Sequence, residues 1–124
     1  MPYSIAFDRE ARRAVIRGVG TVDLATGLGA VVSLMDDPRL EEGYGVLVDI
    51  RDVDYTPSLA EARHLAGLGA EAERLRRHRV AFVTDTQTHF SAAHMVATLA
   101  AMKGVVAKAF RALDEAEGWL AASG

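Results

Sequence analysis

The chain of 124 residues contains no cysteine, and this absence excludes disulfide bonds, thiol catalysis and metal sites built from thiolates. Long apolar runs are also missing, and none approaches the roughly 20 residues that a membrane-spanning helix needs. The first residues, Met1–Ser4, do not lead from a basic region into an apolar core, so a secretory signal peptide is not expected. These absences predict a cytoplasmic protein without a membrane span.

A strong net charge is absent as well. The 14 basic and 17 acidic side chains leave a net charge of −3, which gives no broad attraction to nucleic acid or to an anionic membrane. The basic cluster Arg74–Arg79 has no interleaved aromatic residues, and we interpret it as a solvated helix end. Half of the residues are hydrophobic and a quarter are charged, as in ordinary globular proteins, so residues 1–124 are expected to form one domain.

The hydrophobic pattern switches repeatedly between a period of 2 and a period of 3.6 along the chain. This order, ββαβαβαβα, predicts an α/β fold with a mostly parallel five-stranded mixed sheet, four helices and an antiparallel first strand. The continuous apolar run Val46–Ile50 favours a strand that is covered on both faces. Strands are expected near residues 3–8, 12–18, 45–50, 80–85 and 105–110, and helices are expected to begin at the caps Asp23, Ser58 and Ser91 and at Asp114.

Polar side chains crowd together where the third and fourth strands should end. In open α/β sheets, the carboxyl ends of the strands are the edge at which ligands bind. We therefore expect a small polar ligand or a partner peptide to bind there without turnover. The candidate binding residues are Asp49, Asp52, Tyr55, Ser58, Thr84, Thr86, His89 and Ser91.

The segment Leu47–Tyr55, followed by a serine that opens a helix, resembles the STAS domains, which comprise the anti-sigma-factor antagonists and their uncharacterised bacterial relatives. Arg79–Thr84, the helix start at Phe90–Met95 and the closing segment 110–120 resemble the branch of unknown function. The resemblance implies a STAS-like fold and a regulatory module. In the family, a serine of an Asp-Ser-Ser-Gly turn is phosphorylated by a partner kinase. This chain has Pro57-Ser58-Leu59-Ala60 at that point, which makes Ser58 the possible phosphorylation site.

Ser58 also has a plain structural interpretation, because Glu61 follows it three residues later and the pair completes a capping-box pattern. The three aspartates Asp49, Asp52 and Asp54 lack the glycine and terminal glutamate of a calcium-binding loop, and Arg51 can neutralise them. We therefore expect no metal site and no cofactor.

Other catalytic patterns are weak. The segment Gly18–Asp23 follows a strand but places a carboxylate where a dinucleotide loop needs a small residue. His89 and His94 are five residues apart and do not share a helix face as a zinc-binding pair does. A triad of Ser91, His89 and Asp85 has no supporting nucleophile-elbow motif.

The sequence therefore favours a non-catalytic regulatory or binding module, with a partner protein, a small polar ligand or a second copy in a homodimer as the expected partner. The first alternative is a carrier of a small apolar or lipid-like ligand held between helices and sheet, to which Met35, Met95 and Met102 could contribute. The second alternative is an enzyme of unknown reaction. An apolar cavity would favour the carrier, an exposed Ser58 hydroxyl would favour the phosphorylation switch, and convergent titratable groups in a cleft would favour the enzyme.

Overall fold

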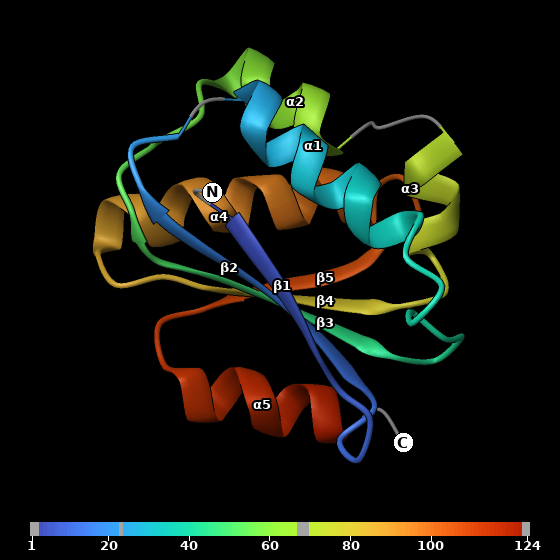
Figure 1. The fold of residues 1–124 in the computed structure, drawn as a ribbon. Coiled ribbons are helices and arrows are strands. Elements are labelled where there is room, and N and C mark those ends of the chain that lie inside the picture. Colours follow the sequence, from blue (N-terminus) through green and yellow to red (C-terminus); the bar gives the residue numbers. More distant parts are fainter. Residues whose placement is uncertain (1–2, 23, 67–69, 123–124) are drawn as a thin grey trace.

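The computed structural model describes residues 3–22, 24–66 and 70–122, which form one five-stranded sheet with helices on both of its faces (Figure 1). The α/β fold and the mixed five-stranded sheet expected from the sequence are confirmed. The elements in chain order are β1 (Tyr3–Asp8), β2 (Arg13–Gly20), α1 (Leu24–Met35), β3 (Gly45–Val53), α2 (Leu59–Ala66), α3 (Ala70–Leu75), β4 (Arg79–Val83), α4 (Gln87–Ala101), β5 (Val106–Phe110) and α5 (Leu113–Ala121).

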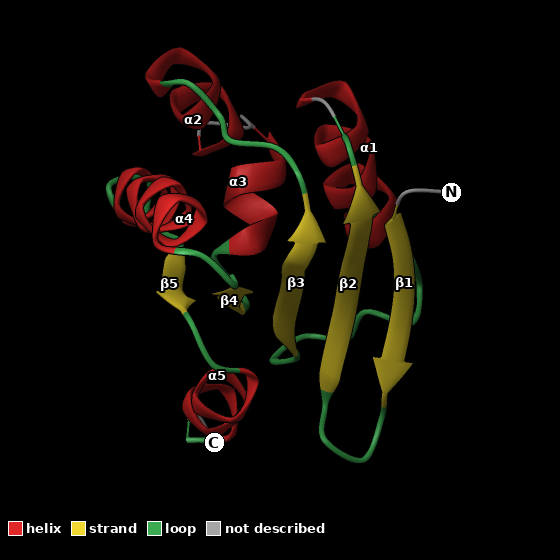
Figure 2. Ribbon diagram, turned by 90° about the vertical axis from the view of Figure 1, so that its left-hand side faces the viewer, coloured by secondary structure: helices red, strands yellow, loops and turns green. Residues whose placement is uncertain are grey.

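The strands lie in the order β1-β2-β3-β4-β5, as Figure 2 shows. β1 pairs with β2 in antiparallel fashion, and β2 to β5 are parallel to one another. Right-handed crossovers between sequentially adjacent parallel strands place every intervening helix on the same face of the sheet. Helices α1 to α4 accordingly cover one face, and α5 alone lies against the other (Figure 1).

Strand β3 is buried on both faces, as its apolar run predicts. Its side chains alternate, so that Val46 and Val48 belong to the core under α1, whereas Leu47 packs with Leu120 of α5. Two separate hydrophobic clusters result, one on each face of the sheet.

A β-bulge interrupts the alternation near the end of β3. Arg17 of β2 lies opposite Asp49, but Val19, two residues later, lies opposite Asp52, which is three residues later. An extra residue in one strand re-aims the side chains that follow it. Asp49 and Asp52 therefore reach the same partner, Arg17, although their separation by three residues would place them on opposite faces of a regular strand.

The helices differ from the expectation in number. One helix was expected over residues 58–78, and the structure has α2 and α3 in that interval, so there are five helices among the described residues rather than four. Gly67 and Gly69 stand between the two helices in the sequence, and glycine has a low helix propensity. The expected cap Asp23 lies outside the described residues.

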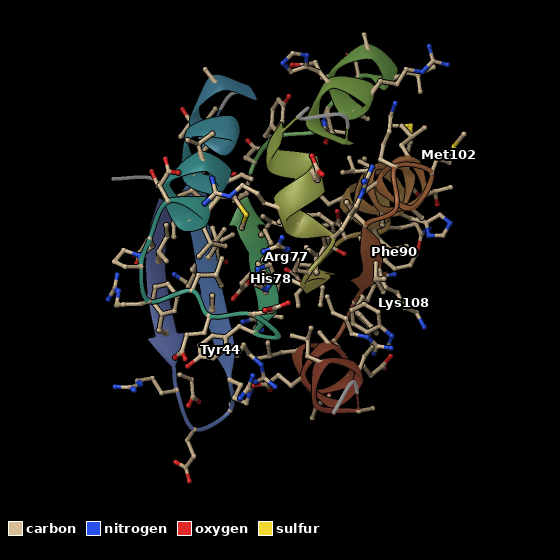
Figure 3. All side chains as sticks on the ribbon, turned by 90° about the vertical axis from the view of Figure 1, so that its right-hand side faces the viewer. Tyr44, Arg77, His78, Phe90, Met102 and Lys108 are labelled. Carbon is tan, nitrogen blue, oxygen red and sulfur yellow. The ribbon has the colours of Figure 1, made fainter. Side chains whose placement is uncertain are left out.

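Helix α4 begins earlier than expected. Its N-cap is Thr86, whose hydroxyl accepts a hydrogen bond from the His89 amide, and not Ser91, which lies within the helix. Met102 was a candidate for the lining of an apolar cavity, but it follows the last turn of α4 with 78% of its surface exposed (Figure 3). Because α4 begins at Gln87, His89 lies in the first turn of this helix.

Candidate functional site

A cavity of about 160 Å³ lies between the sheet and helices α1, α3 and α4. The floor consists of apolar side chains from the central strands, including Val48, Val80 and Phe82. Gly27 and Ala30 of α1 and Ala93 of α4 also line it. These three residues are small, so they fill less of the space between the helices and the sheet than larger side chains would.

Among the described residues that line this cavity, three have side chains with polar atoms: Tyr3, Tyr55 and His89. No lysine, arginine, aspartate or glutamate is among the described residues that line it. Burial raises the pKa of the Tyr3 hydroxyl above its ordinary value, because the phenolate would lose hydration. Tyr3 is therefore a neutral hydrogen-bond donor at physiological pH.

The side chain of Tyr55 is held by a hydrogen bond to a residue in the first turn of α2. Its hydroxyl donates to Oε2 of Glu61 at 2.7 Å. The amide of Ser58 donates to Oε1 of the same carboxylate at 3.1 Å, and the amide of Glu61 donates to the Ser58 hydroxyl at 3.2 Å. This is the reciprocal capping box that the sequence predicts. These bonds favour the charged carboxylate and lower the pKa of Glu61, with the Ser58 amide as the largest cause.

Asp49 and Asp52 are part of an ion-pair network on the α5 face of the sheet. Nε and a terminal nitrogen of Arg51 donate to the two carboxylate oxygens of Asp49 at 2.9 and 2.8 Å. Arg17 bonds to Asp52 and approaches Asp49 to 3.7 Å. Asp49 is only 6% exposed, and the Arg51 hydrogen bond is the largest cause of the lowered pKa of its carboxyl group. The network satisfies these charges internally.

The hydroxyl groups of three further candidates, Thr84, Thr86 and Ser91, form hydrogen bonds within the protein. Thr84 is fully buried, and its hydroxyl donates to the carbonyl oxygen of Phe110 at 3.1 Å. Thr86 caps α4, and Ser91 is exposed on the same helix, where its hydroxyl accepts from Gln87.

The eight candidate residues therefore do not form one pocket. Tyr55 and His89 line the cavity, and Asp49 with Asp52 lies in the ion-pair network on the other face of the sheet. Sequence reasoning missed Tyr3 as a cavity residue. The signal was present, because the alternation in β1 directs Tyr3 inward and its cross-strand neighbour is the glycine Gly18.

The cavity lies between helices and sheet, as expected for the carrier alternative, but its described lining contains no methionine. Met35 is buried elsewhere in the core and Met102 is exposed. Within residues 3–22, 24–66 and 70–122, no group of three or more histidine, aspartate or glutamate side chains could hold a metal ion. None of the described helices combines the length and the apolar character required to cross a membrane.

Comparison with known proteins identifies the fold. No protein-family model matches the chain, and no curated protein matches its sequence. Among solved structures, it is similar to an uncharacterized protein of the DUF3478 family from Shewanella loihica, described as having a SpoIIAA-like fold. The two share 19% sequence identity with a TM-score of 0.59, over 95% of this chain and 91% of the other. The chain thus has the SpoIIAA-like fold, which is the STAS-like architecture that its sequence resembles.

Proposed function

We propose that this SpoIIAA-like domain is a non-catalytic binding module whose internal cavity takes a small, largely apolar ligand. The observation that carries the proposal is the apolar cavity between the sheet and α1, α3 and α4. Ligand sites are typically concave and apolar, with a few polar groups that fix the orientation of the ligand. Tyr3, Tyr55 and His89 are such groups here.

The cavity volume limits the size of the ligand. An engineered protein cavity of about 150 Å³ stays dry and binds benzene or xenon. A cavity of about 160 Å³ therefore suits one ring or a short aliphatic chain. A long acyl chain would have to extend through the cavity mouth, so a small ligand is favoured over a whole lipid.

The groups around the cavity support binding without turnover. General acid–base chemistry usually needs titratable groups that converge on one reacting atom. The carboxylate of Glu61, which contacts the cavity residue Tyr55, already accepts hydrogen bonds from Tyr55 and Ser58. The aspartates Asp49 and Asp52 are paired with arginines on the other face of the sheet.

Binding of toluene, measured by ligand-observed NMR, tests the proposal. The wild-type protein should bind toluene, and Ala93→Leu should abolish binding because the larger side chain fills the cavity from α4. Ala101→Leu is the matched control, since Ala101 is exposed at the end of the same helix and does not line the cavity. Equal binding to both variants would reject the cavity as the site.

A second candidate function is a phosphorylation-switched surface for a partner protein, and it rests on Ser58. This residue is exposed at the start of α2, where amide groups of the helix favour a phosphate. The carboxylate of Glu61, bonded to the Ser58 amide, opposes a second negative charge there. Mass spectrometry of protein purified from its own cell tests this candidate, and phosphate on Ser58 would support it.

A further inference from the structure

We propose that Tyr3 makes the cavity selective for neutral small molecules that carry one hydrogen-bond acceptor, such as a ketone, ester or ether oxygen. This inference rests on the proposed function, since it names the chemistry of the ligand that the cavity would take. It assigns to Tyr3 the role of the donor that orients the ligand.

The position of the Tyr3 ring is set by two glycines. Tyr3 pairs across the antiparallel strands with Gly18, and a Cβ on Gly18 would lie 2.7 Å from Cε1 of Tyr3. A Cβ on Gly27 of α1 would lie 3.8 Å from the Tyr3 hydroxyl oxygen. The ring therefore extends from β1 across β2 until its hydroxyl reaches the cavity wall formed by α1.

The Tyr3 hydroxyl has no hydrogen-bond partner among the described residues, although it is half-buried and lines the cavity. A tyrosine hydroxyl can donate one hydrogen bond, and a donor that no protein acceptor occupies can bond to a ligand oxygen in the cavity. The other tyrosine of the cavity, Tyr55, donates to Glu61. Tyr3 is thus the tyrosine whose donor is available to a ligand.

The charge of the surroundings selects a neutral ligand. No lysine or arginine is among the described residues that line the cavity, so a carboxylate would lose its hydration without a fixed cation in return. A tyrosine hydroxyl is protonated at neutral pH, and burial raises the pKa of Tyr3 further, so this hydroxyl can donate to an uncharged oxygen. His89 also lines the cavity, and an imidazole N–H can donate to an anion as well as to a neutral oxygen.

Two nearly isosteric probes separate the hydrogen bond from apolar packing. Cyclohexanone has one acceptor oxygen, and methylenecyclohexane has a CH₂ group in its place. Dissociation constants are measured by NMR for both probes with the wild-type protein, with Tyr3→Phe and with Tyr44→Phe. Tyr44 is the matched control, because its hydroxyl donates to Glu41 and it does not line the cavity.

We expect Tyr3→Phe to weaken cyclohexanone binding about fivefold, the usual net effect of one hydrogen bond, and to leave methylenecyclohexane binding within about twofold. Tyr44→Phe should leave both probes unchanged. Equal losses for both probes, or no loss for the ketone, would overturn the role of Tyr3 while the proposed function survives. If neither probe binds the wild-type protein, the proposed function fails and this inference fails with it.

Cyclohexanecarboxylate is the third probe. Tighter binding of this anion than of cyclohexanone would overturn the selectivity and point to His89 as the polar partner. If Tyr3→Phe does not fold, the test uses the Tyr3 Cζ chemical shift in the wild-type protein. Cyclohexanone should move this resonance and methylenecyclohexane should leave it nearly unchanged, and the same shift with both probes would contradict the hydrogen bond.

Discussion

The ring of Tyr3 lies so close to the backbone of Gly18, its cross-strand neighbour, that a side chain at position 18 would force its neighbours to move. A Cβ there would lie 2.7 Å from Cε1 of Tyr3 and 2.6 Å from Cγ2 of Val53. Both of these side chains line the cavity. Because Gly18 of β2 has no side chain, Tyr3 and Val53 occupy the space beside it and form part of the cavity wall.

Gly18→Ala should therefore destabilise the protein by about 1–3 kcal/mol, the usual cost of overpacking. The control is Gly29→Ala in α1, where a Cβ would meet nothing within 4 Å and alanine is the better helix former. Urea unfolding of both variants measures the effect. A Gly18→Ala variant as stable as the wild-type protein would show that Tyr3 and Val53 can move aside freely.

The second prediction concerns Ser58 as the N-cap of α2. Removing its hydroxyl leaves the Glu61 amide without its acceptor, so Ser58→Ala should lower the free energy of unfolding by about 1 kcal/mol. Ser58→Gly should cost less, because glycine is itself acceptable at the N-cap. Thermal unfolding of the two variants checks the ranking, and alanine without effect would remove the capping role.

The sequence predicted the strands well because their signal is local. The alternation of Tyr3, Ile5 and Phe7 and the apolar run in β3 are each visible within a few residues. The bulge in β3 is not local, since it depends on the pairing of Asp49 and Asp52 with β2. Asp49 lies on the α5 face by regular alternation with Leu47, and the bulge brings Asp52 to that same face, away from the cavity residue Tyr55.

The cavity itself could not be located from the sequence. Its volume depends on how α1, with Gly27, and α4, with Ala93, pack on the same face of the sheet, which is a property of the packed layers. The start of α4 was misplaced because Thr86 and Ser91 are both acceptable caps by residue type. Only the observed hydrogen bond from the His89 amide selects Thr86.

The third prediction concerns the pH dependence of the Asp49–Arg51 ion pair. The folded-state pKa of Asp49 lies below the value of about 3.9 for an unfolded chain. The stabilisation by this pair is therefore fully present above that value and is lost as the pH falls through the lower folded-state pKa. Arg51→Met should raise the Asp49 pKa measured by NMR titration of its carboxyl carbon.

Arg39→Met is the control for this titration, because Arg39 pairs with Asp37 and not with Asp49. It should leave the Asp49 titration unchanged. An Asp49 pKa that is the same in Arg51→Met and in the wild-type protein would show that the Arg51 hydrogen bonds do not stabilise the carboxylate.

The fourth prediction tests how α5 is held against the sheet. The Trp119 ring lies 5.6 Å from the Phe110 ring, and the Arg79 guanidinium lies over it at 4.7 Å. Trp119→Ala should lower the free energy of unfolding by about 3 kcal/mol, at the low end for a large aromatic residue because Trp119 is half-buried. Trp119→Phe should cost much less. A loss below about 1 kcal/mol for alanine in urea unfolding would mean that α5 is held mainly by other contacts.

The most direct test of the central claim is the location of a bound probe in the wild-type protein. Intermolecular nuclear Overhauser effects should connect toluene to the methyl groups of Val48, Val80 and Val96, which line the cavity from β3, β4 and α4. Contacts confined to exposed residues such as Met102 and Val106, or no contacts at all, would contradict a ligand-binding cavity.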